Sequence, residues 1–134
     1  MESLGRCIIN GRLGEGAMAD VYRAMDPSIG RQVAIKVLKP EYARNPELIV
    51  RFLREARAAG ALSHPNIATI YEVGEEAGVA YIAMELVEGQ PLDSMLQTGG
   101  RMPYERVLMF GAQLAGALGY AHRMGVVHRD VKPS

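Results

Sequence analysis

The chain has 134 residues, of which 49% are apolar, and this is enough to form the core of one domain. Its 15 basic residues balance 15 acidic residues, so neither nucleic acid nor an anionic membrane is expected as its main partner. A single cysteine excludes an internal disulfide, and no stretch reaches the ~20 apolar residues of a membrane span. We therefore expect a cytoplasmic protein with no signal peptide and no membrane segment in this chain.

Residues 6–38 predict three antiparallel strands. Short apolar or alternating stretches are separated first by the glycine-rich residues 14–16 and then by turn formers at residues 26–30. In the third strand Val33, Ile35 and Val37 alternate with other residues, so Lys36 points to the opposite face from these three. Lys36 is therefore expected to be presented by the sheet and not buried in its core.

Helical spacing begins at Asn45. Leu48, Phe52, Glu55 and Ala59 recur at helical intervals up to about Ala61, which places Glu55 on the apolar face. Residues 68–73 and 79–86 then predict a second pair of strands around a loop at residues 74–78. These segments together predict a sheet of about five strands with one helix.

After the turn at residues 88–91 the residue pattern becomes typical of helices. A short helix is predicted through Leu96, and a long one from residue 103 to about 124, with one face formed by Val107, Phe110, Leu114, Leu118 and Ala121. This change predicts an α+β fold in which residues 6–87 form a sheet lobe and residues 88–134 begin a helical lobe.

The glycine-rich turn at residues 13–21 lets backbone N–H groups approach phosphate oxygens closely. Gly14, Gly16 and Ala19 also satisfy the dinucleotide fingerprint, for which Glu41 could serve as the ribose-binding acid. That fold needs a helix directly after the glycines, but only residues 20–25 separate Ala19 from the next turn. A strand, turn and strand is therefore expected, and an ordinary glycine hairpin stays an alternative for the loop taken alone.

A lysine within a half-buried strand is costly unless it is paired, because its ammonium loses hydration. Glu55 is the partner that the helical pattern offers to Lys36. The alternative is that both side chains are solvated, as most lysines and glutamates are. We expect the pair because Glu55 shares the apolar face of its helix.

The chain closes with His128, Arg129, Asp130, Val131, Lys132, Pro133 and Ser134. In order and spacing, this segment together with Gly14-x-Gly16, Val21, the Val33–Lys36 stretch and Glu55 resembles the eukaryotic-like (Hanks-type) serine/threonine protein kinases, with the character of their bacterial members. The resemblance covers the chain from about Arg6 onward. It implies a protein-kinase-like fold with a five-stranded antiparallel N-lobe and its helix C, followed by the first helices of the C-lobe.

The resemblance implies that ATP is the cofactor and that serine or threonine hydroxyls of proteins are the substrates. The ATP-binding residues implied are Leu13, Gly14, Glu15, Gly16, Ala17, Met18, Ala19, Val21, Ala34, Lys36, Met84, Glu85 and Val87. Met84 would gate the back of the adenine pocket, whereas Glu85 and Val87 would bind the base through backbone groups.

Four residues are implied to be catalytic. Asp130 would orient the substrate hydroxyl and accept its proton, and Lys132 would offset charge on the transferring phosphoryl group. Lys36 would hold the α- and β-phosphates while Glu55 holds Lys36. His128 is expected to organise the loop, since a lone histidine is most often a hydrogen-bonded structural group.

Mg²⁺ is the second implied cofactor, but the asparagine and the Asp-Phe-Gly metal site of the family are expected after Ser134, so no metal ligand is predicted within this chain. The chain alone is therefore expected to be inactive, with the apolar face of its long helix open. A non-catalytic kinase-like module that binds ATP or a partner is the alternative function.

Overall fold

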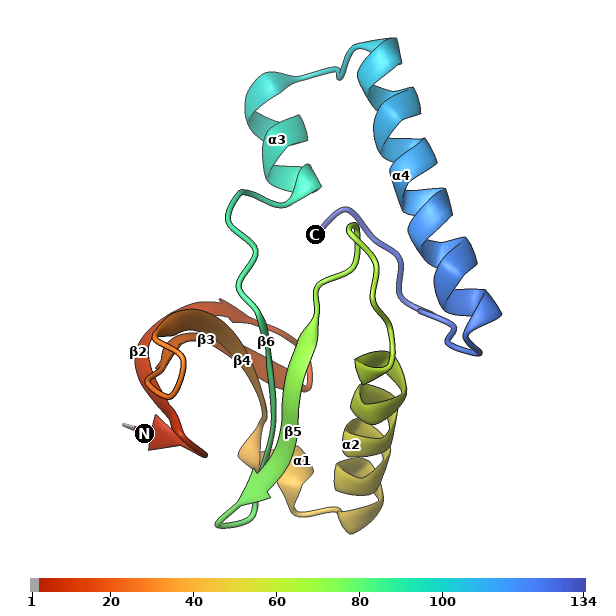
Figure 1. Cartoon of the computed structure of the whole chain (residues 1–134). Helices are drawn as coiled ribbons and strands as arrows, with labels where there is room; N and C mark the ends of the chain where they lie inside the picture. Colours follow the sequence, from red (N-terminus) through yellow and green to blue (C-terminus); the bar gives the residue numbers. More distant parts are fainter. Residues whose placement is uncertain (1–2) are drawn as a thin grey trace. The chain divides into compact units, whose positions relative to one another are not determined.

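The computed structural model describes residues 3–134 (Figure 1) and divides them into two compact units. The first unit holds the chain up to Ala61 together with Ala68–Val87, and the second holds Leu62–Ile67 and Glu88–Ser134. The chain thus leaves the first unit briefly after its main helix, returns for a strand pair, and then enters the second unit at residue 88. Each unit is described by itself below.

An antiparallel sheet forms the first unit (Figure 1). Its strands are β1 (Ser3–Leu4), β2 (Cys7–Glu15), β3 (Ala19–Asp26), β4 (Arg31–Leu38), β5 (Ile70–Glu76) and β6 (Val79–Glu85), in the order β1-β2-β3-β4-β6-β5. The predicted mostly antiparallel sheet is confirmed, with one addition. The two-residue strand β1 pairs with the start of β2 and is too short to leave a periodic signal.

The two faces of the sheet carry different residues. On one face the alternating residues Val33, Ile35 and Val37 of β4 are buried to 6% exposure or less and pack with Tyr81 and Ala83 of β6. These residues belong to the larger core cluster, and β4 is central to it because residues 33–37 are paired with a strand on each side. The alternation read from the sequence therefore identifies the core face correctly.

Part of the opposite face, at β5 and β6, is covered by helix α2 (Pro46–Gly60), which follows the single turn α1 (Pro40–Ala43). The Asn45 side chain caps α2 by accepting a hydrogen bond from the Glu47 amide at 3.0 Å, and Pro46 occupies the first turn, where its missing N–H costs nothing. Leu53 of α2 packs there with Leu38 and Ala80 of the sheet.

The turn between β3 and β4 is built around a buried carboxylate. Asp26 is 3% exposed, and its Oδ1 accepts hydrogen bonds from the Ser28 amide at 3.0 Å and the Ser28 hydroxyl at 2.6 Å. Its other oxygen, Oδ2, lies 3.0 Å from the Arg6 guanidinium. These contacts hold the pKa of Asp26 below its ordinary value, with the Ser28 hydroxyl as the largest cause.

The connection of β5 and β6 is tighter than predicted. Gly74 lies inside β5 and not in a loop, and the turn consists of Ala77 and Gly78, with φ of 49° and 77°. Gly74 is opposite Tyr81 in the register, and a Cβ on Gly74 would come within 2.7 Å of the Tyr81 hydroxyl. The glycine therefore makes room for a tyrosine and does not mark a turn.

Of Gly14 and Gly16, which precede the turn between β2 and β3, only Gly16 is required by the geometry of the turn. The Gly16 amide donates to the Ala19 carbonyl at 2.9 Å, and a Cβ on Gly16 would lie 2.7 Å from that same oxygen. Gly14, by contrast, has no atom within 4 Å of such a Cβ. Gly16 is thus a steric requirement of the turn itself, whereas Gly14 leaves open space.

The second unit contains helices α3 (Leu92–Gly99) and α4 (Tyr104–Arg123). The Tyr120 hydroxyl of α4 accepts a hydrogen bond from the Ser63 amide at 3.0 Å, and the Tyr120 ring lies 5.3 Å from the ring of His64. In α4 only Ala117 and Ala121 are buried. None of the helices in residues 3–134 has the length and apolar character needed to cross a membrane.

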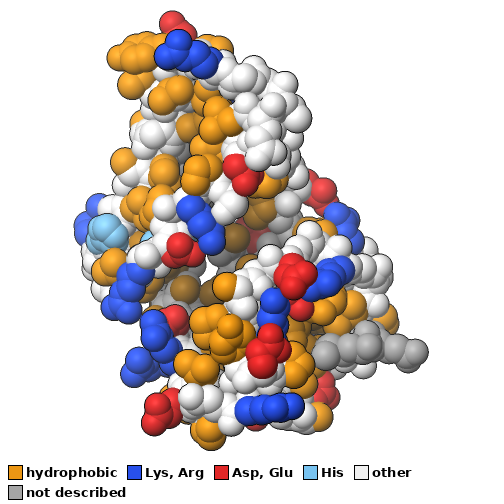
Figure 2. Space-filling view, turned by 180° about the vertical axis from the view of Figure 1, so that it is seen from behind, with side chains coloured by type: hydrophobic (Ala, Val, Ile, Leu, Met, Phe, Trp, Pro, Cys, Tyr) orange, Lys and Arg blue, Asp and Glu red, His pale blue; other side chains and the backbone are white. Residues whose placement is uncertain are grey.

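The apolar face predicted for α4 is exposed at some positions and buried at others. Val107 is 50% and Leu114 is 49% exposed, and Figure 2 shows hydrophobic side chains gathered on the surface of this upper part of the molecule. Phe110 and Leu118 of the same face are half-buried, and Ala121 is buried. The helix and the spacing of its apolar residues agree with the sequence pattern.

The substitution Asp26→Asn is expected to lower the free energy of unfolding at neutral pH. The lowered pKa means that the carboxylate stabilises the fold above its ordinary value of 3.8, and that this contribution is lost as pH falls through the lowered pKa. Urea unfolding at about pH 7 and about pH 3 measures this free energy for Asp26→Asn and for the unsubstituted chain. The difference between the two proteins should be smaller at about pH 3. The exposed Glu75→Gln is the control, and an equal loss at both pH values would contradict the prediction.

Alanine substitutions at the two glycines of the β2–β3 turn should differ. Gly16→Ala must displace the Ala19 carbonyl, so we expect it to destabilise the fold by about 1–3 kcal/mol. Gly14→Ala meets no atom, and its effect should stay within about 0.5 kcal/mol. Urea unfolding measures both values, and equal effects would show that the close contact at Gly16 is relieved without cost.

Candidate functional site

The central strands of the sheet bring four of the predicted site residues onto one face. Val21 of β3 is paired directly with Lys36 of β4, and Ala34, two residues before Lys36, is paired with Met84 of β6. Residues directly opposite in an antiparallel pair share a face, as do residues two apart on a strand. Val21, Ala34, Lys36 and Met84 therefore form one patch on the face opposite to Val33 and its neighbours.

The patch combines an apolar floor with one cation. Ala34 is buried at 6% exposure, Val21 and Met84 are half-buried, and Lys36 is exposed as predicted. Leu13 follows at the end of β2, where the register shifts between Arg12 and Gly14. This arrangement offers a flat apolar surface beside a positive charge.

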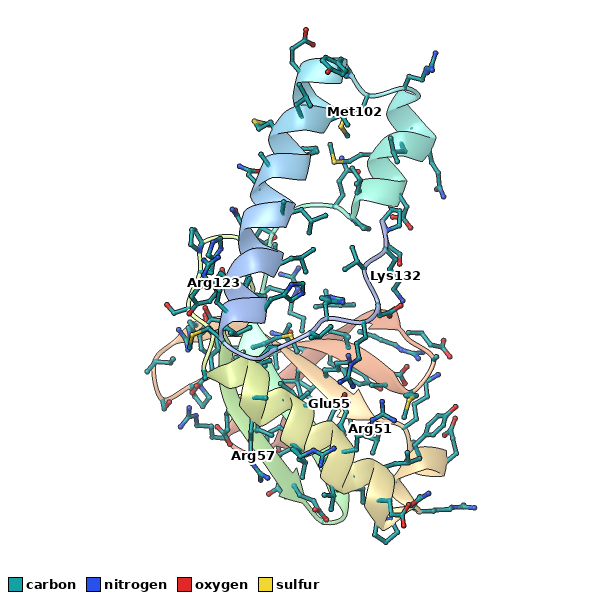
Figure 3. All side chains as sticks on the ribbon, turned by 90° about the vertical axis from the view of Figure 1, so that its right-hand side faces the viewer. Arg51, Glu55, Arg57, Met102, Arg123 and Lys132 are labelled. Atoms are coloured by element: carbon teal, nitrogen blue, oxygen red, sulfur yellow. The ribbon has the colours of Figure 1, made fainter. Side chains whose placement is uncertain are left out.

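The predicted ion pair between Lys36 and Glu55 is wrong for this structure. Glu55 Oε1 instead lies 2.9 Å from the Arg51 guanidinium, and both side chains are more than half exposed on α2 (Figure 3). Arg51 precedes Glu55 by one helical turn, so the two meet without any tertiary contact. Within residues 3–134 Lys36 has no ion-pair partner.

The sequence pattern assigned Glu55 to the buried face of α2, and this assignment explains the error. Leu53 and Ala56 are the buried residues of α2, and Ile49 and Phe52 pack beside Leu53 against the sheet. Glu55 lies next to these residues and is 54% exposed, and Leu48 and Ala59 are only partly buried. Two rows of apolar residues run side by side on this helix, and the periodicity did not distinguish them.

The end of β6 is secured by a side chain whose role the sequence did not indicate. The Glu85 amide donates to the Thr69 carbonyl at 2.8 Å, while Glu85 Oε2 accepts from the Thr69 amide at 3.0 Å. These two bonds extend the pairing with the chain before β5 and fix the path of the segment that leads to Val87, which is 68% exposed. Since the partners are remote in sequence, no local signal could have identified them.

Asp130 and Lys132 lie together in the second unit. Lys132 Nζ is 3.2 Å from Asp130 Oδ2, and both side chains are mostly exposed (Figure 3 labels Lys132). The Asp130 amide donates to His128 Nδ1 at 3.2 Å, so His128 holds the backbone of this segment. Arg129 between them has a φ of 66°, which a residue with a side chain adopts only when its surroundings impose it.

The same segment is attached to α3. The Asp93 amide, in the first turn of α3, donates to the Pro133 carbonyl at 3.0 Å. This bond satisfies one of the free N–H groups at the start of the helix and anchors the residues that follow Lys132. Within residues 3–134 no cluster of three or more His, Cys, Asp and Glu side chains could hold a metal ion.

A cluster of charged residues at the base of the glycine turn was also missed. Arg12 and Lys39 lie close to Glu15 and Asp20, with distances between 3.1 and 3.8 Å across the cluster. Arg12 and Glu15 are near neighbours in sequence, but Lys39 comes from the far end of β4. Only the pairing of β3 with β4 brings it there.

Comparison with known proteins identifies a family. A model of the protein kinase domain matches residues 8–134. The chain is 43% identical over 134 residues to a probable serine/threonine-protein kinase, SCO3848, of Streptomyces coelicolor, covering 97% of this chain and 20% of that protein. It is 44% identical over 134 residues to the serine/threonine-protein kinase PknA of Mycobacterium tuberculosis, covering 96% of this chain and 31% of that one.

Solved structures agree with this result. The crystal structure of the Mycobacterium tuberculosis PknI kinase domain superposes with a TM-score of 0.85 at 35% identity, covering 98% of this chain and 54% of that one. The chain thus spans about half of that kinase domain and less than a third of the curated relatives. From the motifs, the fold and these matches, the chain belongs to the bacterial serine/threonine branch of the protein kinase family and corresponds to the first part of its catalytic domain.

Proposed function

We propose that the protein is an ATP-dependent kinase that transfers the γ-phosphoryl group to serine or threonine hydroxyls of other proteins. The observation that carries the proposal is Lys36, an exposed lysine without an ion-pair partner in residues 3–134, on the same sheet face as Val21, Ala34 and Met84. An unpaired cation beside an apolar floor suits a ligand that has a flat base at one end and phosphates at the other.

On this proposal the first unit binds the nucleotide. Val21, Ala34 and Leu13 contact the base on this proposal, and Met84 sets the depth of the space beside it. Backbone groups of Glu85 and Val87 bind the base edge, while the amides of residues 14–19 and the Lys36 ammonium hold the phosphates. Glu55 joins Lys36 only when it leaves Arg51, an exchange between exposed ion pairs that costs little.

Phosphoryl transfer falls to the segment around Asp130. The hydroxyl oxygen of the substrate attacks the γ-phosphorus while its proton passes to the Asp130 carboxylate, and the bond from the γ-phosphorus to the β,γ-bridging oxygen breaks to release ADP. Lys132, 3.2 Å from Asp130, offsets charge on the phosphoryl oxygens. His128 keeps the Asp130 backbone in place. Mg²⁺ would supply charge neutralisation for the phosphates when bound.

A partner-binding module without catalysis is the second candidate. The exposed apolar residues Val107 and Leu114 of α4 favour it, since an open apolar face suits a protein partner. The kinase is preferred because Lys36, Asp130 and Lys132 are all present, and a module that only binds has no need of the last two. As a kinase the protein would act in signalling in the cytoplasm, where ATP is available.

Lys36→Met and Asp130→Asn in the full-length protein should each keep the fold and lose most phosphate transfer. Lys36 is not in the core, and losing the general base alone costs about 10²- to 10⁴-fold in turnover. Magnesium-dependent transfer of labelled phosphate to a generic protein substrate measures the loss, and thermal melting verifies the fold. The exposed Arg57→Met is the control. Near-normal turnover in both variants would leave the binding module as the better proposal.

Met84→Gly in the full-length protein should allow the use of ATP analogues with a bulky group on the adenine N6. The half-buried Met84 side chain lies opposite Ala34 on the base-binding patch, so its removal opens space there. If Met84 serves only the core, its truncation costs about 2–5 kcal/mol of stability and nothing else. The exposed Met109→Ala is the matched control. A folded Met84→Gly variant that uses the analogue no better than the unsubstituted protein would contradict the assignment.

A further inference from the structure

Two carboxylates face each other across the base of the glycine turn. Glu15 ends β2 and Asp20 lies in β3, and the two are direct partners in the register. Like charges directly opposite in an antiparallel pair are destabilising. Asp20 is also the partner of Val37, so this acidic pair lies on the sheet face opposite to Lys36, and the two carboxylates repel each other across the base of the turn.

Arg12 and Lys39 compensate both carboxylates. The Arg12 guanidinium lies 3.2 Å from Glu15 Oε2 and 3.1 Å from Asp20 Oδ1, and Lys39 Nζ lies 3.3 Å from Glu15 Oε1 and 3.8 Å from Asp20 Oδ1. Each cation thus bridges the two strands. The close contact with Asp20 is the main cause that raises the pKa of Arg12.

Lys39 and Asp20 are the less solvated members of this cluster of four charged residues. The side chains of Lys39 and Asp20 are 15% and 18% exposed, against 50% for Arg12 and 64% for Glu15. Charges that are largely withdrawn from water are screened less by salt, so Lys39 contributes more to compensation than an exposed lysine does. Loss of Lys39 would leave a shielded carboxylate without its second counterion.

Lys39 also holds the tip of the turn through its backbone. Its amide donates to the Met18 carbonyl at 2.9 Å, directly beyond the pairing of Ala19 with Leu38. The same residue therefore contacts the tip by its backbone and both strands at the base by its side chain. Lys39 directly follows β4, the strand that carries Lys36. Its contacts therefore fix the position of the turn relative to that strand.

We propose that Lys39, assisted by Arg12, is a positioning residue for nucleotide binding. It neutralises Glu15 and Asp20, which would otherwise repel each other, and so holds the glycine turn in place over the sheet face that carries Lys36. The proposal rests on the proposed function, since it assigns these residues to the same nucleotide site. Lys39 does not contact the reacting atoms and acts through the turn.

Steady-state kinetics of the full-length protein tests the charge role. Lys39→Met should raise KM for ATP about fivefold, the effect of an ion pair of this type, and change kcat by no more than about twofold. Added salt should reduce the difference, because it screens the repulsion between the two carboxylates, of which Glu15 is 64% exposed. Lys39→Arg should stay near the unsubstituted protein, and Arg57→Met is the control.

A rescue variant separates charge compensation from general structural damage. Lys39→Met combined with Glu15→Gln and Asp20→Asn removes the lysine together with both carboxylates, so KM for ATP should return toward the value of the unsubstituted protein. A KM that stays raised in the combined variant overturns the charge explanation. A KM for ATP that is the same in Lys39→Met and Arg57→Met overturns the positioning role.

Hydrogen exchange without nucleotide tests the same contacts independently of activity. Lys39→Met should speed exchange of the amides of residues 16–19 relative to Arg57→Met, because the turn loses its anchor at the base. If the unsubstituted protein does not bind ATP, the proposed function and the nucleotide role of Lys39 both fail. If it binds ATP but exchange is unchanged by Lys39→Met, only the positioning inference fails.

Discussion

The alternation of side chains along β4 is the constraint on which the rest of the first unit depends. Val33, Ile35 and Val37 occupy one face of a strand that is paired on both sides, and their burial fixes the register of β3 and β6 against it. A slip by one residue would expose this row and bury Lys36, so the hydrophobic term strongly disfavours it. The position of Lys36 is therefore a consequence of core packing on the other face.

The distribution of charge around Lys36 gives the site its character. Glu55, the expected partner of Lys36, is already paired with Arg51, and Asp20, opposite Val37 in the register, lies on the other face of the sheet. Lys36 is left without an ion pair on the described chain. A cation whose potential partners are neutralised elsewhere attracts an anionic ligand, which is the electrostatic basis for assigning the phosphates to this face.

In the second unit, backbone hydrogen bonds hold the segment that carries Asp130 and Lys132, and burial of these two side chains does not. Asp130 and Lys132 are exposed, but their segment is held by the bond from the Asp130 amide to His128, by the constrained φ of Arg129 and by the bond from α3 to Pro133. Such contacts fix a main-chain path while leaving the side chains accessible. That is the arrangement expected of groups that must meet a protein substrate, for which fixed position matters more than burial.

The sequence by itself determined the two-part α+β organisation, the faces of β4, the helical pattern after residue 91 and the family, because each is written in local periodicity or in a motif of fixed spacing. Only the tertiary structure decided the partners. Glu55 meets Arg51 and not Lys36, Glu85 binds Thr69, Gly74 makes room for Tyr81, and Lys39 reaches the glycine turn. The physical reason is that periodicity specifies which face a side chain occupies, whereas an ion pair or a close contact depends on distances of a few ångströms, which are set by strand register and helix rotation.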